Sequence, residues 1–173
     1  MSSQPAVRTD AFDPALEARI ESLRYDLDHM ALQATVLDRD MRFRFVNPAY
    51  AAFAGRPATD ILGRTPGEVW ARTPRDGRRT MLARALEGET VIFDRETLEG
   101  PNAGRWVRAH YLPLHADARV VGVLIILTDI QHLKDTERTL AERERHLTMI
   151  TDVAGFPISY RSEERRVGKE CRL

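Results

Sequence analysis

The segment VVGVLIILTDIQHLK, residues 120–134, decides the fold because it joins two kinds of structure without a spacer. Residues 120–127 are apolar and rich in β-branched side chains, interrupted only by Gly122, which predicts a largely buried strand. Thr128 and Asp129 are residue types that cap helices, and charged residues at helical spacing follow them. A core strand that leads directly into an exposed helix can carry a change in the core out of the domain. This arrangement favours a sensor or signal relay over an enzyme.

The composition fits one folded domain with connecting helices. The chain has 173 residues, of which 43% are hydrophobic and 30% charged, so it can bury a core and stay in solution. Its formal net charge of zero argues against a nucleic-acid-binding surface. No apolar run is long enough to span a membrane, and residues 1–10 lack the apolar segment of a secretory signal. These features predict a cytoplasmic protein.

The C-terminal segment RSEERRVGKECRL, residues 161–173, needs separate treatment. All but its last two residues match the translation of a common sequencing-library adapter. We therefore expect a non-native tail here and a natural protein that continued differently, with a genuine basic tail as the alternative. The only cysteine, Cys171, lies in this tail, so no disulfide, thiol nucleophile or thiolate metal site is expected.

A heptad pattern follows a polar N-terminus, residues 1–12, which we expect to be disordered. Asp13 and Pro14 are typical of a helix start, and the helix is expected to span residues 13–31. Its apolar positions alternate four and three residues apart and are Leu16, Ile20, Leu23, Leu27 and Met30. Two interpretations stay open: a helix packed on its own domain, or a dimer seam that pairs with a second chain.

The next segment predicts a β-hairpin formed by residues 34–38 and 42–47. Because side chains alternate along a strand, Phe43 and Phe45 are expected to share one face. Asn47 then precedes a proline, a combination that predicts the start of another short helix.

The remaining pattern completes a mixed domain over residues 32–130. Residues 78–86 predict a helix, and residues 89–97, 105–114 and 120–127 predict three further strands. The order of two strands, small helices and three strands predicts an α+β domain with a five-stranded antiparallel sheet.

Three segments together resemble the PAS domain of bacterial signalling proteins. They are TVLDRDMRFRFVNPAYAAFAGR (35–56), ILGRTPGEVW (61–70) and RWVRAHYLPLHADARVVGVLIILTDIQHLK (105–134). The resemblance implies the PAS fold, in which short helices pack on one face of the antiparallel sheet and enclose a pocket with it. It also implies that an Asp-Ile pair, here residues 129–130, closes the last strand and begins a signalling helix.

The resemblance extends to the end of the chain. Leu133, Leu140 and Leu147 lie seven residues apart, so residues 131–150 are expected to form a coiled-coil-like signalling helix, with an exposed helix laced by ion pairs as the alternative. Residues 151–160 resemble the truncated start of a second PAS repeat. The resemblance then implies a missing output domain of cyclic-di-GMP enzyme, histidine kinase or chemotaxis type. The residues expected to transmit the signal are Thr128, Asp129, Ile130, Leu133, Leu140 and Leu147.

The resemblance also implies a ligand pocket lined mainly by apolar and aromatic side chains. The expected lining residues are Phe45, Tyr50, Phe53, Met81, Phe93, Trp106, His110 and Ile126. A core-like empty interior and a small apolar or weakly polar ligand both stay open. The flavin photosensors of this family need an Asn-Cys-Arg-Phe motif, which residues 47–50 lack, so flavin photochemistry is not expected. Haem is not expected because residues 78–86 offer no axial histidine.

Catalytic motifs are not found in the sequence, which shows no metal-ligand cluster, phosphate-binding glycine loop or nucleophile motif. His110 and His115 would face opposite sides of a regular strand, which argues against a shared metal. We therefore expect a cytoplasmic PAS sensor or dimerisation module that is not an enzyme and forms a homodimer through its flanking helices. The alternatives are a ligand-free interaction domain and a small enzyme that uses His110.

Overall fold

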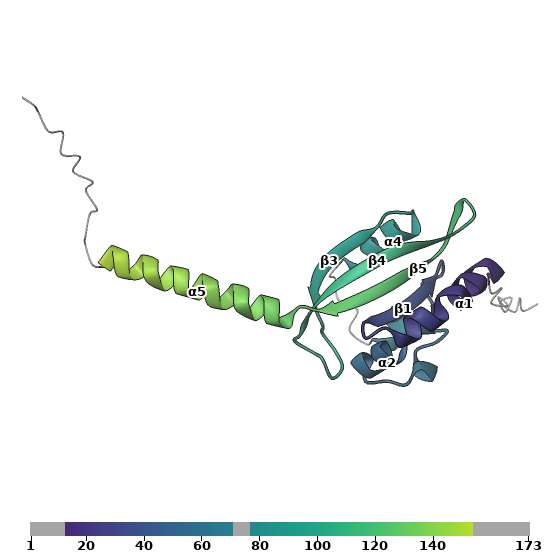
Figure 1. Cartoon of the computed structure of the whole chain (residues 1–173), viewed down its shortest axis with the longest axis horizontal. Coiled ribbons are helices and arrows are strands. Elements are labelled where there is room, and N and C mark those ends of the chain that lie inside the picture. Colours follow the sequence, from purple (N-terminus) through teal and green to yellow (C-terminus); the bar gives the residue numbers. More distant parts are fainter. Residues whose placement is uncertain (1–12, 71–76, 154–173) are drawn as a thin grey trace, which may run out of the picture. The chain divides into compact units, whose positions relative to one another are not determined.

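The computed structural model describes residues 13–70 and 77–153, shown in Figure 1. The chain divides into two compact units, residues 1–134 and residues 135–173. The expected disordered N-terminus, the first strand of a second repeat and the tail 161–173 lie outside the described residues. In chain order the elements are α1 (Pro14–His29), β1 (Gln33–Asp38), β2 (Phe43–Val46), α2 (Pro48–Ala54), the 3-10 turn η1 (Ala58–Asp60), α3 (Pro66–Val69), α4 (Arg78–Leu86), β3 (Val91–Glu96), β4 (Trp106–Ala116), β5 (Arg119–Asp129) and α5 (Gln131–Val153).

One antiparallel sheet organises the first unit. Its five strands lie in the order β2-β1-β5-β4-β3, so the last strand in sequence is the central one. β5 pairs with β1 on one side and with β4 on the other. The predicted α+β domain with a five-stranded antiparallel sheet is therefore confirmed, and the apolar character of residues 120–127 follows from burial on both faces.

The apolar stripe of α1 packs on one face of this sheet (Figure 1). Leu16, Ile20 and Leu27 are at most 4% exposed, and Leu23 and Met30 pack against the same cluster. Their contacts are with the sheet of their own chain, so these residues are not available for the predicted seam with a second chain. The alternative interpretation, a helix packed on its own domain, is the one that the structure shows.

The small helices pack on the other face of the sheet. Tyr50 from α2, Val69 from α3 and Leu82 from α4 join the core cluster that Val123 and Leu127 form on this face. The sheet therefore lies between two apolar layers, one built by α1 and the other by α2, α3 and α4.

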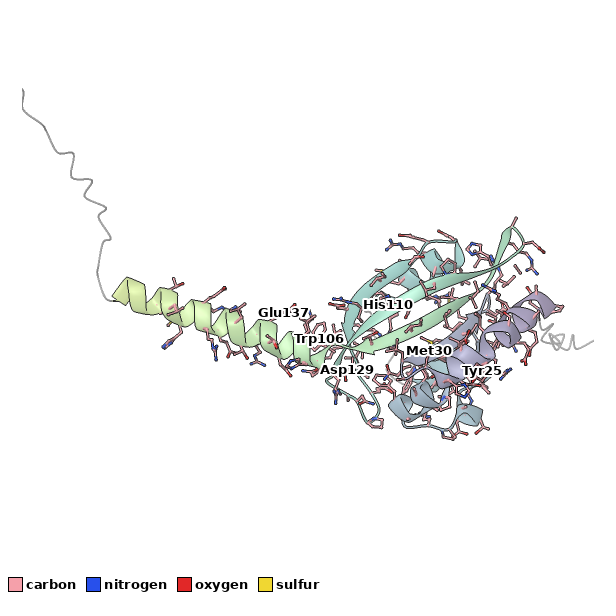
Figure 2. The ribbon with its side chains drawn as sticks, viewed as in Figure 1. Tyr25, Met30, Trp106, His110, Asp129 and Glu137 are labelled. Carbon is pink, nitrogen blue, oxygen red and sulfur yellow. The ribbon has the colours of Figure 1, made fainter. Side chains whose placement is uncertain are left out.

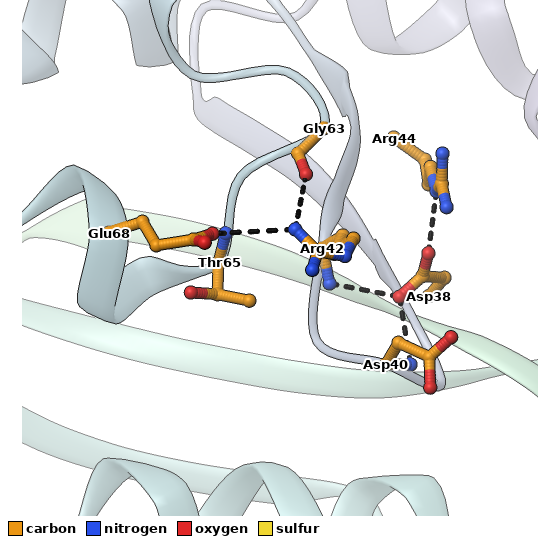
Figure 3. Close-up of polar contacts among 7 residues, drawn as sticks. All are labelled: Asp38, Asp40, Arg42, Arg44, Gly63, Thr65 and Glu68. Carbon is orange, nitrogen blue, oxygen red and sulfur yellow. Dashed lines mark hydrogen bonds and ion pairs between the residues drawn. The ribbon is translucent and has the colours of Figure 1, made fainter. Parts of the chain in front are cut away.

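A β-bulge in β2 separates the two phenylalanines of the hairpin. Phe45 lies opposite Val36, but Phe43 lies opposite the very next residue, Leu37, so Arg44 is the extra residue. Phe43 consequently joins the cluster under the small helices, whereas Phe45 joins the α1 cluster. The prediction that they share a face is wrong because it assumed regular alternation. Arg44 Nε lies 2.5 Å from Asp38 Oδ2 at the end of β1, as Figure 3 shows.

Asn47 connects four backbone segments from a position that is fully buried. Its Nδ2 donates to the carbonyl oxygens of Leu27 and Leu32, both at 2.9 Å. Its Oδ1 accepts from the backbone N–H of Ala34 at 3.0 Å and of Tyr50 at 2.8 Å. The predicted helix cap is confirmed by the bond to Tyr50. The same side chain also ties the end of α1 and the start of β1 to α2.

Candidate functional site

A cavity of about 430 Å³ lies on the face of the sheet that carries the small helices. Phe53 from α2, Leu82 from α4 and Ile125 from β5 form part of its apolar wall. Arg95 from β3 and Thr97, just beyond it, add polar groups to the wall. The volume and the mixture of apolar and polar lining are those of a small-molecule site.

Strand alternation places Arg95 on this face. Val91 and Phe93 of β3 lie on the face of the sheet that carries the small helices. Arg95 and Thr97 follow at intervals of two residues, so they lie on the same face. Arg95 pairs across the sheet with Val107, which is fully buried. Arg95 was not among the site residues expected from the sequence, although the strand alternation within residues 91–97 is a signal that identifies it.

Two tyrosines lie beside these polar groups. Tyr50 and Tyr111 both line the cavity and are at most 7% exposed. Burial raises the pKa of Tyr50 to about 12, against the opposing effect of the positive charges on Arg95 and Arg78. The Tyr50 phenol therefore stays neutral through the physiological pH range and acts as a hydrogen-bonding group, not as an anion.

Four of the predicted lining residues lie on the face of the sheet that carries the small helices and the cavity. Tyr50 and Phe53 line the cavity. Met81 and Phe93 pack against the same core cluster as partly buried residues but do not line the cavity. The Phe93 ring meets the Tyr111 ring edge-on, with a centroid distance of 5.2 Å, so it fills the core behind the cavity wall.

The other four, Phe45, Trp106, His110 and Ile126, do not line the cavity. Ile126 and Phe45 belong to the α1 cluster, the latter because of the bulge in β2. His110 pairs with Ile126 across the sheet and so shares its face, and Trp106, four residues before His110 in β4, lies on that face too. These residues were predicted from their apolar or aromatic character, which both faces of this sheet share.

The junction between β5 and α5 is held by contacts with the start of β4. Asp129 Oδ2 accepts from Arg105 Nη2 at 2.5 Å, and Asp129 Oδ1 accepts from the Gln131 N–H at 2.8 Å. Gln131 Oε1 in turn accepts from the Trp106 N–H at 2.9 Å, and the Ile130 N–H donates to the Trp106 carbonyl oxygen at 3.0 Å. Figure 2 shows Trp106 and Asp129 where the strand meets the helix.

Lys134 adds a contact from the first turn of α5. Its Nζ lies 3.5 Å from Asp94 Oδ2 and 5.6 Å from the centroid of the Trp106 ring. Asp94 also binds Arg108, with Oδ1 2.7 Å from Nε. The Arg108 guanidinium beside Asp94 holds the pKa of that carboxyl below its usual value. The first turn of α5 is thus connected to β3 as well as to β4.

The residues predicted to transmit a signal lie along this junction and α5. Thr128 and Asp129 belong to β5 and are not the first helical residues, and Ile130 is buried between strand and helix. Asp129 nevertheless accepts from the first N–H of α5, as a capping residue does. The heptad positions Leu133, Leu140 and Leu147 are 43%, 58% and 64% exposed. Their role in transmission stays a prediction.

Neither a metal cluster nor a membrane-spanning helix occurs in residues 13–70 and 77–153. No three His, Cys, Asp or Glu side chains of this part come close enough to hold a metal ion. No helix within it combines the length and the apolar character needed to cross a bilayer. The register shift beside Leu114 and His115 leaves its extra residue, Val121, in β5. Leu112, Leu114 and Ala116 of β4 all pack in the α1 cluster, so the alternation of β4 continues and His110 and His115 lie on opposite faces, as the sequence predicted.

Comparison with known proteins gives one family and many structures of the same fold. The family described as "PAS fold" matches residues 27–135. No curated protein matches the chain. The PAS domain of Bordetella pertussis BvgS is 23% identical, with a TM-score of 0.58 over 75% of this chain and 98% of that one.

Two longer solved structures share the fold at lower sequence identity. An RNA-binding Light-Oxygen-Voltage receptor is 19% identical, with a TM-score of 0.61 over 83% of this chain and 41% of that one. The phage VqmA–DPO complex is 18% identical, with a TM-score of 0.60 over 83% of this chain and 71% of that one. This chain therefore spans less than half the length of the first of these structures.

Proposed function

The chain belongs to the PAS fold family, and we propose that it senses a small molecule in its cavity and passes the bound state to α5. Domains of this family are generally sensory or interaction modules and not catalysts. One observation carries the proposal. Ile125 lines the cavity, and four residues later the same strand ends at Asp129, which binds the first N–H of α5.

The connection between β5 and α5 leaves little room to absorb a movement. Ile130 alone separates the strand from the helix, and its side chain is 8% exposed. A shift of β5 against β4 would therefore change the contacts of Asp129 with Arg105 and of Gln131 with Trp106. A ligand that binds one arrangement of these contacts more tightly than the other shifts the population toward it.

The helix that receives this change is suited to contact other protein elements. Leu133, Leu140 and Leu147 recur every seven residues along α5 and are all exposed in the isolated chain. We propose that two chains associate through this stripe and that α5 leads to an output domain of a signalling protein. The seam first predicted on α1 plays no part in this proposal, since α1 packs on the sheet. The cytoplasmic location stays a prediction from the sequence.

Replacing Asp129 with alanine tests whether the junction is held as described. The variant loses the pair with Arg105 and the bond from the Gln131 N–H, so we expect the Ile130 and Lys134 amides to exchange with solvent about fivefold faster. These two amides donate to Trp106 O and Ile130 O, both at 3.0 Å, and report on the first turn of α5. The measurement is amide hydrogen exchange by NMR.

A matched control removes another exposed ion pair, one that lies within α5 and away from the junction. Glu142→Ala breaks the pair with Arg138, whose Nε lies 3.1 Å from Glu142 Oε1, and should leave the Ile130 and Lys134 amides unchanged. Because both pairs are exposed, the free energy of unfolding should change by about 1 kcal/mol or less in each variant. Equal exchange rates in Asp129→Ala and the wild type would show that Asp129 does not hold the junction.

A further inference from the structure

We propose that the cavity binds a small molecule with a carboxylate on an apolar body, and that Arg95 and Thr97 hold the carboxylate. This inference deepens the proposed function, because it rests on the cavity being the ligand site and names the chemical class of the ligand. The sequence predicted an apolar or weakly polar ligand because Arg95 was not among the expected lining residues. The structure places Arg95 in the cavity wall, which favours a charged ligand group.

The charge of the cavity wall is the first observation. Arg95 lines the cavity from β3, and Arg78 and Arg79 line it from the first turn of α4. The acidic side chains on the described wall are Asp40 and Glu99, so positive groups are in excess. An arginine fork binds a carboxylate through two parallel hydrogen bonds, which makes it a specific partner for this group.

Thr97 supplies the second observation. It is 7% exposed, and its hydroxyl oxygen is buried with no hydrogen-bond partner among the described residues. Its backbone is fixed by two short bonds, from its N–H to Arg105 O at 2.8 Å and from the Gly104 N–H to its own carbonyl at 2.7 Å. A buried hydroxyl without a partner is costly, so a ligand oxygen at this position would stabilise the site.

The surrounding residues define the rest of the ligand. Phe53, Leu82 and Ile125 give the cavity an apolar side that a hydrocarbon or aromatic body would cover. Tyr50 supplies no competing negative charge to Arg95 at neutral pH, because burial raises the pKa of its phenol to about 12. The wall therefore offers an apolar surface for the body of the ligand and a cationic group for its carboxylate. The neutral Tyr50 phenol does not repel that carboxylate.

Pairs of acids and their amides test the inference. The probes are indole-3-acetate with indole-3-acetamide and 4-phenylbutyrate with 4-phenylbutyramide, titrated calorimetrically into the full chain. Each pair has the same body and differs in charge. We expect at least one acid to bind about tenfold more tightly than its amide, since only the acid forms charge-assisted bonds with Arg95.

Variants assign the preference to named groups. Arg95→Met should reduce the acid-to-amide ratio of affinities to about one while changing the affinity for the amide by less than about threefold. Arg95→Lys should keep part of the preference. Thr97→Val, which removes only the hydroxyl, should weaken the acid about fivefold. Arg19→Met is the control, because Arg19 is exposed on α1, on the other side of the sheet.

The possible outcomes decide the inference clearly. Amides that bind as tightly as their acids, acids that do not bind, or a preference that survives in Arg95→Met would each overturn it. If Arg95→Met does not fold, the Arg95→Lys and Thr97→Val variants provide the test, and an unchanged acid-to-amide ratio in both overturns it. The Asp129→Ala exchange experiment uses no ligand, so the proposed relay can fail or hold independently of this result.

Discussion

Replacing Asn47 with alanine is expected to lower the free energy of unfolding by about 4 kcal/mol. The substitution removes four hydrogen bonds from a fully buried side chain. It leaves the carbonyls of Leu27 and Leu32 and the N–H groups of Ala34 and Tyr50 without these partners, and all but the Leu32 bond are buried. Urea unfolding followed by circular dichroism measures the change.

Asn102 provides a matched control for this prediction. Its Nδ2 makes one hydrogen bond, to Phe53 O at 2.7 Å, and its side chain is only partly buried. Asn102→Ala should therefore cost about 1 kcal/mol. If Asn47→Ala costs no more than Asn102→Ala, the Asn47 side chain does not hold α1, β1 and α2 together.

Replacing Gly122 with alanine is expected to cost about 3 kcal/mol and to loosen α1. A Cβ at this position would lie 2.6 Å from the carbonyl oxygen of Leu37 and 2.9 Å from Leu16 Cδ1. The Leu37 oxygen belongs to the backbone of a paired strand and cannot move without disturbing the sheet. Leu16 would be displaced from the cluster that holds α1.

Gly63→Ala is the control for this steric effect, because it replaces a glycine by alanine at a position where the new Cβ meets no neighbouring atom. Gly63 has a φ of +76°, but a Cβ there would meet nothing within 4 Å, so only backbone strain of about 1–2 kcal/mol is expected. Amide exchange adds a second readout, because α1 should exchange faster in Gly122→Ala and stay protected in Gly63→Ala. Equal protection of α1 in both variants would contradict the close packing of Gly122 against Leu16.

The architecture followed from local patterns because most elements have clear local signals. Residues 78–86 form the helix with the bounds that the sequence predicted, and the apolar run 120–127 lies within the central strand. The bulge in β2 could not be predicted in this way. The spacing of Phe43 and Phe45 is that of a regular strand, and the bulge is defined by their register against β1.

The site was harder to predict because the same residue types serve both faces of the sheet. His110 and Ile126 are cross-strand neighbours on the face opposite the cavity. Their aromatic and apolar character is the same as that of the cavity wall, so residue type alone does not indicate which face holds a ligand. The heptad stripe of α1 is likewise typical of both a coiled coil and a helix on a sheet. Arg95 is the group that sequence reasoning left out, because a charged residue was not expected on a core face.

Transmission from the cavity to α5 is tested most directly by amide exchange of the full chain with and without a bound probe. The probe is whichever acid or amide of the two pairs binds most tightly. In the wild type, saturation should change exchange at the Ile130 and Lys134 amides by more than about threefold, and Asp129→Ala should bind equally well without this change. Unchanged exchange at both amides in the wild type, with altered exchange at the cavity wall, would contradict a relay through β5.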